Sequence, residues 1–460
     1  MRDVTSYDVM VIGSGSGAEI VDAALQQGLR VAYVDRGPLG GTCANVGCIP
    51  TKMIIYPADV IMEVREAQRL GMRAEVRSID FEAIMQRMRH LVEHDRQHME
   101  ISLRHPPENL DFFPEEGHFV DRYTLEVAGR RLRADKVFIA AGARTYVPPI
   151  DGIEQVGYLD NVSVLQLEKL PASVTIIGGG YIACEFAHFF SAMGSDVTIV
   201  QRNRYLAPQE DHEVSEHLAA KLRERMRVVT GAEVVAARKE RNERVIVAHE
   251  VATGATHEFR SEVILLAAGR ISNADTLQVA NTGVEVDERG YIKVDQYLRT
   301  NVPNIWAFGD IIGRKMFKHV ANREALFAWH NSQHDHMAAP DYRAAPHAIF
   351  TWPEVASVGL TEAEAKAQYR DILVGKAQYT DVARGIAMVE PESFANAVVD
   401  PETYRVLGFH IIGRHAPMVI QEVVQAMATG AGIDAISAGM HIHPALNEVV
   451  LRAFAHLHPA

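Results

Sequence analysis

Cysteine is scarce in this chain: its 460 residues include three, and two of them lie in one glycine-rich segment, GGTCANVGCIPTK. Structural zinc sites usually take two cysteine pairs at CxxC spacing, and the single pair Cys43 and Cys48 does not fit that pattern. A stabilising disulfide usually closes a longer loop, because a longer loop restricts the unfolded chain more. The remaining interpretation is a redox pair that opens and closes during catalysis, beside a group that exchanges electrons with it.

The sequence also lacks long apolar runs and an excess of positive charge. Its apolar runs, such as residues 263–268, are far shorter than the ~20 residues that a helix needs to cross a bilayer. The formal net charge of −13 argues against nucleic acid or an anionic membrane as the main partner. The chain starts with a strand-like segment instead of a basic region and an apolar core. We therefore expect a cytoplasmic protein, in a reducing compartment that suits a working dithiol.

Near the N-terminus, YDVMVIGSGSGA reads as a strand that leads through a glycine-rich turn into a helix. The turn carries Gly13, Gly15 and Ala18 at GxGxxA spacing, and the next strand ends at Asp35, which completes a dinucleotide fingerprint. Glycine lets a pyrophosphate approach the backbone, and the helix N-terminus offers it N–H groups and a partial positive charge. Asp35 is placed to accept a hydrogen bond from a ribose hydroxyl, as in FAD or NAD.

The fingerprint recurs after a second apolar strand, where the turn carries Gly178, Gly180 and Ala183. Two such units in one chain predict two dinucleotides. The second unit has no acid at the end of its second strand and offers Arg202 and Arg204 instead, which suit the 2′-phosphate of NADP(H). The alternative is that both arginines are only solvated loop residues.

Three more segments are typical of a nucleotide-binding protein. IAAGAR and LLAAGR each follow an apolar strand and place a glycine, Gly142 or Gly269, in a turn of small residues. WAFGDI places Asp310 just after another apolar strand, where an acid can bind ligand hydroxyls or cap the next helix.

Together these motifs resemble those of the FAD-dependent pyridine nucleotide-disulfide oxidoreductases. The match runs along essentially the whole chain: two fingerprints, GGTCxNxGCxPxK, the AxGR turn, the GD segment and a C-terminal HPxxxE. The resemblance implies an α/β fold with two Rossmann-like domains, for FAD and NAD(P), and a C-terminal α+β domain that forms a homodimer. The implied bounds are 1–148 and 277–345 for the two FAD-binding segments, 149–276 for the NAD(P)-binding domain and 346–460 for the interface domain.

The resemblance also implies roles for the cysteine segment. Cys43 would be the interchange thiol that meets the substrate disulfide, and Cys48 would contact the flavin as a thiolate. Lys52 and Glu185 match a lysine–glutamate pair beside the flavin, where the cation would stabilise negative charge and the acid would hold the cation. In a regular helix, residues at the spacing of the two cysteines lie too far apart for a disulfide. We therefore expect an irregularity at Gly47 and the proline that follows the pair.

The C-terminal segment HIHPALNEVV matches the acid–base histidine of the family. His443 would take and return the proton of Cys43, and Glu448 would bond the far ring nitrogen of the imidazole. Pro444 is expected at the first position of the following helix. The alternative for the histidines of this segment and of WHNSQHDHM is a metal site. Zinc needs three or four converging ligands, and no cysteine or acid completes either set, so we expect no metal.

Two features that the sequence lacks reduce the number of candidate substrates. No cysteine follows Cys184, which disfavours mercuric reductase and high-molecular-weight thioredoxin reductase, and the first fingerprint helix lacks the arginines of glutathione reductase. The prediction is a dihydrolipoamide dehydrogenase that uses FAD and NAD(H) or NADP(H), with a lipoyl-carrying protein as a candidate partner. Mycothione reductase is the alternative, because CIPTKMIIYPADV, KHVANREA and the two arginines resemble it. An FAD-dependent NAD(P)H oxidase or transhydrogenase is a third hypothesis, although such relatives often lack one cysteine of the pair.

Overall fold

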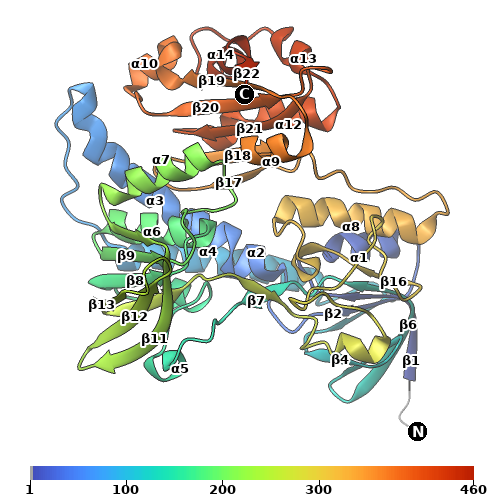
Figure 1. The fold of residues 1–460 in the computed structure, drawn as a ribbon. Coiled ribbons are helices and arrows are strands. Elements are labelled where there is room, and N and C mark those ends of the chain that lie inside the picture. The colour runs from blue at the N-terminus through green and yellow to red at the C-terminus, as the bar shows by residue number, and fades with distance from the viewer. Residues whose placement is uncertain (1–3) are drawn as a thin grey trace. The chain divides into compact units, whose positions relative to one another are not determined.

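The computed structural model describes residues 4–460, which divide into two compact units (Figure 1). Unit 1 comprises the described residues of Met1–Thr51 together with Met85–Tyr146 and Gly269–Pro340. Unit 2 comprises Lys52–Ile84, Val147–Ala268 and Asp341–Ala460. Each unit is therefore assembled from stretches that are far apart in the sequence.

Unit 1 is built on a seven-stranded sheet in the order β3-β2-β1-β6-β5-β4, with β16 also paired to β6. Its parallel strands are β1 (Val4–Ile12), β2 (Val31–Val34), β3 (Leu110–Phe113), β6 (Arg130–Ile139) and β16 (Ile305–Ala307). The antiparallel strands are β4 (Gly117–Asp121) and β5 (Thr124–Val127). Helices α1 (Ala18–Gln26) and α8 (Lys318–Gln333) pack against each other. The parallel strands end at one edge, where ligands of such sheets bind.

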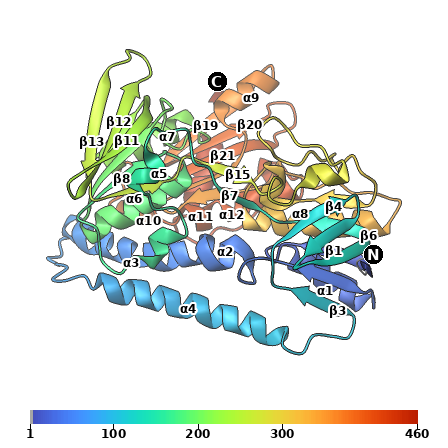
Figure 2. The same ribbon diagram turned by 90° about the horizontal axis from the view of Figure 1, so that it is seen from below.

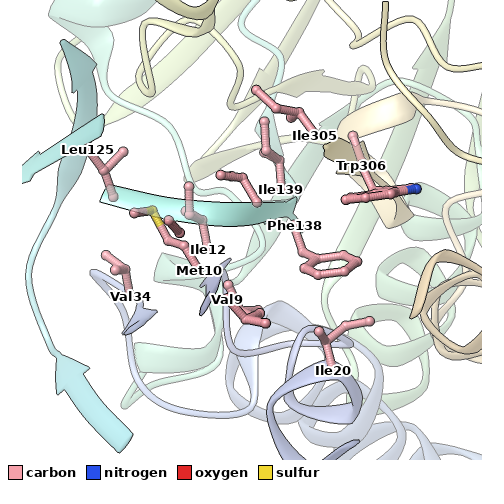
Figure 3. Close-up of a cluster of buried hydrophobic side chains, with 14 of the residues drawn as sticks. Val9, Met10, Ile12, Ile20, Val34, Leu125, Phe138, Ile139, Ile305 and Trp306 are labelled. Carbon is pink, nitrogen blue, oxygen red and sulfur yellow. The ribbon is translucent and has the colours of Figure 1, made fainter. Parts of the chain in front are cut away.

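The core of unit 1 lies between this sheet and its helices, and Figure 3 shows part of it. Val9 and Met10 are neighbours in β1 and are both fully buried, as expected for a parallel strand covered on both faces. The ring of Phe138 stacks on Trp306 with centroids 5.2 Å apart. Each fully buried large apolar side chain contributes about 1.5–3 kcal/mol. This packing holds the ends of β1 and β6 in place beneath the glycine-rich turn.

The first half of unit 2 contains a four-stranded parallel sheet in the order β10-β9-β8-β14. Its strands are β8 (Ser173–Ile177), β9 (Asp196–Gln201), β10 (Arg227–Thr230) and β14 (Val263–Leu266). The helices that follow β8 and β9 are α6 (Tyr181–Met193) and α7 (His212–Arg223). Figure 2 shows the antiparallel sheet of β11 (Ala232–Glu240), β12 (Glu243–Glu250) and β13 (Thr256–Ser261), which packs beside β8 and β9.

The C-terminal part of unit 2 is a six-stranded antiparallel sheet in the order β17-β18-β21-β20-β19-β22. Its strands are β17 (His347–Ile349), β18 (Val355–Gly359), β19 (Leu373–Gln378), β20 (Phe394–Val399), β21 (Val406–Ile412) and β22 (His458–Pro459). The helices of this part are α9 (Glu362–Gln368), α10 (Ala383–Met388), α11 (Ala416–Val419), α12 (Gln421–Ala428), α13 (Ile433–Ser437) and α14 (Glu448–Ala455). The expected combination of two Rossmann-like sheets and an α+β domain is confirmed.

The remaining elements connect these sheets. They are the helices α2 (Gly41–Val46), α3 (Cys48–Glu66), α4 (Phe81–Ser102) and α5 (Ile153–Val156), and the paired strands β7 (Ala143–Thr145) and β15 (Arg270–Ser272). The 3-10 turns are η1 (Ala67–Leu70), η2 (Ser163–Gln166), η3 (Val279–Thr282), η4 (Gly309–Ile312) and η5 (Tyr379–Asp381). Over residues 4–460, no helix combines the length and the apolar character that a membrane crossing requires.

Candidate active site

The turn after β1 forms an open cradle at the edge of the unit 1 sheet. Gly13 has a φ of +107°, and a Cβ there would lie 2.2 Å from the carbonyl oxygen of Ala140, so only glycine fits. At Gly15, by contrast, an added Cβ would meet no atom within 4 Å. Ala18 begins α1 directly after the turn, and the N–H groups of a helix start favour a phosphate. The turn therefore has the space and the donors that the pyrophosphate of FAD needs.

Asp35 ties the end of β2 to this cradle. Its Oδ2 accepts a hydrogen bond from the Ser14 backbone N–H at 2.5 Å, and its Oδ1 accepts one from the Gly37 N–H at 2.8 Å. A carboxylate offers about four acceptor positions, so Asp35 can still receive a ribose hydroxyl. The Ser14 hydroxyl accepts a bond from the Gly40 N–H at 3.1 Å, just before the cysteine segment. The acid, the cradle and the cysteine segment are therefore hydrogen-bonded into one structure.

The cysteine segment folds as two helices with a break between them. Cys43 lies within α2 and is half-buried, whereas Cys48 is the first residue of α3 and is exposed. The expected irregularity is present at Gly47, which leaves the helical conformation at φ −139° and ψ −115°. Pro50, where it was also expected, lies in the first turn of α3. Gly41 has a φ of +65°, and a Cβ there would lie 2.9 Å from the Cα of Gly15. The backbone that carries the cysteines therefore rests directly on the cradle.

The turn after β8 repeats this construction in unit 2. Gly178 has a φ of +115°, and a Cβ there would lie 2.2 Å from the carbonyl oxygen of Ala267. A Cβ at Gly180 would meet nothing within 4 Å, as at the corresponding glycine of unit 1. Ala183 is fully buried in the first turn of α6. This second cradle fits the pyrophosphate of a nicotinamide dinucleotide for the same reasons.

The two arginines that were predicted to bind the 2′-phosphate of NADP(H) follow the end of β9. Gln201 is buried, whereas the side chain of Arg202 is 68% exposed and lies 3.5 Å from Glu233. Arg204 is also exposed, with its guanidinium 5.4 Å from the ring centroid of Tyr205. A loosely held, solvated guanidinium can turn towards a 2′-phosphate at little cost.

The predicted turns after β6, β14 and β16 are present. Gly142 and Gly269 have φ values of +68° and +132°, and a Cβ at either would meet nothing within 4 Å. Asp310 lies in η4, with its Oδ2 3.6 Å from Nε of Arg270. Burial raises the pKa of Asp310, and the charge of Arg270 acts in the opposite direction. The carboxyl of Asp310 is thus held by one arginine in a position where a ligand hydroxyl can reach it.

Lys52 and Glu185 form a bidentate ion pair within unit 2. Nζ lies 2.7 Å from Oε2 and 2.9 Å from Oε1 of Glu185, which is 3% exposed. Burial raises the pKa of Glu185, whereas the charge of Lys52 lowers it. The Phe350 backbone N–H also donates to Oε1 at 3.1 Å. These contacts fix the direction of the ammonium group, and its role beside a flavin stays a prediction.

His443 and Glu448 are paired as the sequence predicted. Nδ1 of His443 lies 2.9 Å from Oε1 of Glu448, and the imidazole is 73% exposed. Oε2 of Glu448 accepts a bond from the Ala445 N–H at 3.1 Å. The hydrogen bond from His443 lowers the pKa of Glu448. The prediction for Pro444 is wrong: α14 begins only at Glu448, because residues 444–447 form turns that bring its carboxylate back to the histidine.

Sequence reasoning missed Lys318, which lies at the start of α8. Its Nζ donates to Oγ of Ser16 at 3.2 Å, and Ser16 donates to Oδ1 of Asn322 at 2.7 Å. Ser16 belongs to the first glycine-rich turn, so this lysine lies beside the cradle. The one sequence signal was the cation at the start of the KHVANREA helix, a position that the helix dipole disfavours.

A buried polar chain in unit 2 was missed as well. Nη1 of Arg225 donates to Nδ1 of His188 at 2.9 Å, and Nε2 of His188 lies 2.8 Å from Oδ1 of Asp59. Burial lowers the pKa of His188 well below its usual range, and Arg225 adds to the effect. The neutral ring therefore carries its proton on Nε2 and donates it to Asp59. Burial, reinforced by neighbouring carboxylates, raises the pKa of Asp59 to about 7.

Unit 1 holds the cysteines, the first cradle and Asp310, and unit 2 holds the second cradle, Lys52–Glu185 and His443–Glu448. Across residues 4–460, no group of three or more histidine, cysteine, aspartate or glutamate side chains is arranged to hold a metal ion. His441 is bonded instead to Glu422, with Nε2 and Oε2 2.7 Å apart.

Comparison with known proteins identifies the family. Residues 7–325 match the family Pyridine nucleotide-disulphide oxidoreductase, and residues 345–454 match its dimerisation domain. Mycothione reductase of Mycobacterium tuberculosis is 36% identical over 97% of this chain and 98% of its own. Dihydrolipoyl dehydrogenase of Chlamydia pneumoniae is 33% identical over 96% of this chain and 95% of its own.

A solved structure gives the same result. The HOCl-induced flavoprotein disulfide reductase RclA from Escherichia coli superposes with a TM-score of 0.85 and 29% identity, over 98% of this chain and 99% of that chain. The structure and the comparisons point to the same family: the chain has two similar cradles with a cysteine pair packed on the first, and its relatives match over nearly their whole length. The chain belongs to the pyridine nucleotide-disulphide oxidoreductases, enzymes that use FAD and NAD(P)H.

Proposed function

We propose that this enzyme passes electron pairs between NAD(P)(H) and a small disulfide or dithiol through the redox pair Cys43 and Cys48. The observation that carries the proposal is the contact between Gly41 and Gly15, which sets the cysteine segment against the FAD cradle. When bound, FAD would supply the two-electron link between the nicotinamide and the cysteines. The chain's own residues would hold the cofactors and manage protons and charge.

Two ion pairs would support the chemistry. His443 would take the proton of the attacking thiol and return one to the leaving sulfur, with Glu448 fixing the ring through Nδ1 and leaving Nε2 for the substrate. Lys52 would place positive charge near the flavin, and the buried carboxylate of Glu185 would keep it there.

The residues proposed to hold the cofactors share one feature: they lie in the segments that follow the ends of strands, in turns or at helix starts. For FAD they are Gly13, Gly15, Ala18, Asp35, Gly142 and Asp310. For NAD(P) they are Gly178, Gly180, Ala183, Arg202, Arg204 and Gly269. The four-segment domain division implied by the sequence is retained as part of this proposal.

Dihydrolipoamide is the substrate predicted from the sequence, with a lipoyl-carrying protein as its natural carrier. A mycothiol-type disulfide reduced by NADPH is the second candidate. It is favoured by the exposed guanidinium groups of Arg202 and Arg204, which follow β9 where NAD-binding units place an acid. The two candidates differ in coenzyme, in substrate and in the direction of electron flow.

The working unit is proposed to be a homodimer in which each site takes its histidine from the partner subunit. His443 follows Ile442, which is 78% exposed, and Met440 is exposed as well. Exposed apolar side chains around a polar group are typical of an interface. A two-fold dimer would cover both copies of this segment at once.

Steady-state assays with purified enzyme test the proposal. Oxidation of dihydrolipoamide by NAD⁺ should be compared with reduction of mycothione by NADPH, with Cys48→Ser as the matched inactive variant. Turnover of one pair that Cys48→Ser abolishes supports the assignment and selects the substrate. Oxygen consumption that persists in Cys48→Ser would indicate an NAD(P)H oxidase instead.

A further inference from the structure

Lys318 has no role in the function proposed above, although its ammonium group lies in a polar environment beside the first cradle. Lys318 is the first residue of α8 and is half-buried, and its Nζ donates to Oγ of Ser16 at 3.2 Å. Ser16 is itself buried and donates its hydroxyl proton to Asn322, one helical turn after the lysine. The hydroxyl therefore turns a lone pair towards Nζ, and the chain Lys318–Ser16–Asn322 fixes the position of the ammonium.

This position is unfavourable for a cation on two counts. The positive end of the α8 dipole repels it, because Lys318 is at the helix start. Burial lowers the pKa of Lys318. A negative charge nearby would favour the ammonium form.

Lys318 and the cysteine segment lie against the same glycine-rich turn: Nζ of Lys318 bonds to Ser16, and the Gly40 N–H donates to Oγ of Ser14. A Cβ on Gly41 would also lie 2.9 Å from the Cα of Gly15.

Three groups around this turn would, when ionised, interact with the lysine. They are Cys43 of α2, Glu19 of α1 and Cys48 of α3, and each of them acts to raise the pKa of the lysine. Glu19 is exposed, which weakens its effect through solvent screening. Cys48 is exposed as well and is screened in the same way, so the half-buried Cys43 is the group with which this cation would interact most strongly.

Lys318 differs from Lys52 in how its charge is compensated. The ammonium of Lys52 contacts both oxygens of the buried Glu185 carboxylate. The ammonium of Lys318 is bonded to a neutral hydroxyl. Its field therefore remains available to the cysteines.

We propose that Lys318 stabilises the thiolate forms of Cys43 and Cys48, and so sets how readily the reduced pair reacts. In substrate reduction, the Cys43 thiolate attacks one sulfur of the disulfide, and the other sulfur leaves and takes up a proton. The Cys48 thiolate then attacks Sγ of Cys43, which restores the protein disulfide and releases the second sulfur to a proton. Both attacks need a thiolate, so a nearby cation promotes both. This inference rests on the proposed redox role of the pair.

The experiment measures the ionisation of the thiols in the FAD-containing enzyme. Dithiothreitol reduces the pair and is then removed, and the rate of alkylation by iodoacetamide is followed against pH. The variants are Lys318→Met, Lys318→Arg and the exposed Lys315→Met as the matched control. We expect Lys318→Met to move the pH midpoint upwards by about one unit, which lowers the rate roughly tenfold at pH values below the midpoint. Lys318→Arg and Lys315→Met should keep the wild-type midpoint.

Two results would overturn the inference. One is an unchanged midpoint in Lys318→Met with a normal flavin content. The other is loss of bound flavin with no change in the midpoint, which would make Lys318 a cofactor-binding cation. Failure of the proposed function shows up separately, because NADPH or NADH would then fail to reduce the pair in the wild-type enzyme. The alkylation profile requires neither coenzyme nor substrate.

Discussion

Gly41 and Gly15 pack backbone against backbone: a Cβ on Gly41 would lie 2.9 Å from the Cα of Gly15. The first glycine precedes the cysteine pair, and the second forms the open side of the cradle in which we propose that FAD binds. The two positions differ in the space around them. Gly41 is confined by the protein itself, whereas the space above Gly15 is left for a ligand.

Alanine substitutions at Gly15 and Gly180 should distinguish the FAD site from the NAD(P)H site. At Gly15 and Gly180 a Cβ meets no protein atom, so either variant should fold. Gly15→Ala should lose bound FAD, and Gly180→Ala should keep FAD but bind NAD(P)H more weakly. Each lost backbone contact to a phosphate is worth about 1.5–3 kcal/mol. Flavin absorbance per mole of protein and coenzyme titration measure these effects, with circular dichroism as the folding control. Normal flavin content in Gly15→Ala would contradict the cradle assignment.

The two glycine-rich fingerprint turns could be predicted because each needs glycine at positions that a short stretch of sequence reveals. A Cβ at Gly13 or Gly178 would lie 2.2 Å from a backbone carbonyl oxygen, so both turns require glycine at a fixed place after an apolar strand. The break at Gly47 follows from helix geometry in the same way. His443 and Glu448 are five residues apart, so their pairing could also be predicted from the sequence.

The missed features depend on contacts between distant segments. Ser16 and Asn322 are 306 residues apart, and His188 and Asp59 are 129 residues apart. No periodicity links such positions, because their approach is decided by how the sheets and helices pack. The position of Pro444 was missed for a different, local reason: the Ala445 N–H donates to the Glu448 carboxylate, and α14 begins only at Glu448.

The two cysteines should give different spectra when replaced singly. Two-electron reduction of the wild-type enzyme should produce a long-wavelength absorbance band from a thiolate beside the flavin. Cys48→Ser should abolish this band, and Cys43→Ser should show it without reduction, because Cys48 then has no partner for a disulfide. Cys184→Ser is the control, since Cys184 is fully buried and lies in unit 2. Wild-type spectra and turnover in both single variants would rule out the redox pair.

Replacing Arg202 and Arg204 by alanine should weaken the binding of NADPH more than the binding of NADH. Both side chains are exposed beyond the end of β9, so the change should leave the fold intact. A charged hydrogen bond to the 2′-phosphate contributes about 1.5–3 kcal/mol, which corresponds to a rise of roughly 10- to 150-fold in the KM for NADPH. The exposed Arg223→Ala in α7 is a matched control. A wild-type enzyme that already prefers NADH strongly would refute the phosphate role.

Asp59 should make the stability of the protein depend on pH near neutrality. Its pKa is about 7 in the folded chain against an ordinary 3.8, because of burial and neighbouring carboxylates. The folded form therefore binds the proton more tightly than the unfolded form. The stabilisation is complete below the unfolded pKa and is lost as the pH rises through about 7. Three pKa units set an upper bound of about 4 kcal/mol.

Urea unfolding of wild type and Asp59→Asn at about pH 4 and about pH 8 measures this effect. The free energy of unfolding should fall with rising pH in the wild type by up to ~4 kcal/mol more than in Asp59→Asn. The amide keeps an oxygen that accepts the His188 proton but does not titrate. Asp196→Asn, an exposed acid of the same unit, should behave as wild type. Parallel pH profiles for wild type and Asp59→Asn would contradict the prediction.

The last prediction concerns the dimer. Cys43 is in unit 1 and His443 in unit 2, and the exposed imidazole is bonded to Glu448 through Nδ1, so Nε2 is not engaged by this glutamate. A thiol and its acid–base partner must come within hydrogen-bond reach in the reacting state. In a two-fold dimer the histidine of one subunit can serve the cysteines of the other, and two such sites arise together.

Mixing two inactive variants tests whether the sites are shared. Cys43→Ser and His443→Ala should each be nearly inactive as homodimers, because acid–base catalysis typically contributes 10²–10⁴-fold and the thiol is indispensable. When they are refolded together, half of the dimers should be mixed, and each mixed dimer should have one intact site and one doubly damaged site. Activity should return to roughly a quarter of the wild-type value. Co-refolding Cys43→Ser with Cys48→Ser is the matched control: both lesions lie in the same segment, so no intact site can form in either subunit. Mixed dimers of the first pair that stay inactive would show that each chain uses its own histidine.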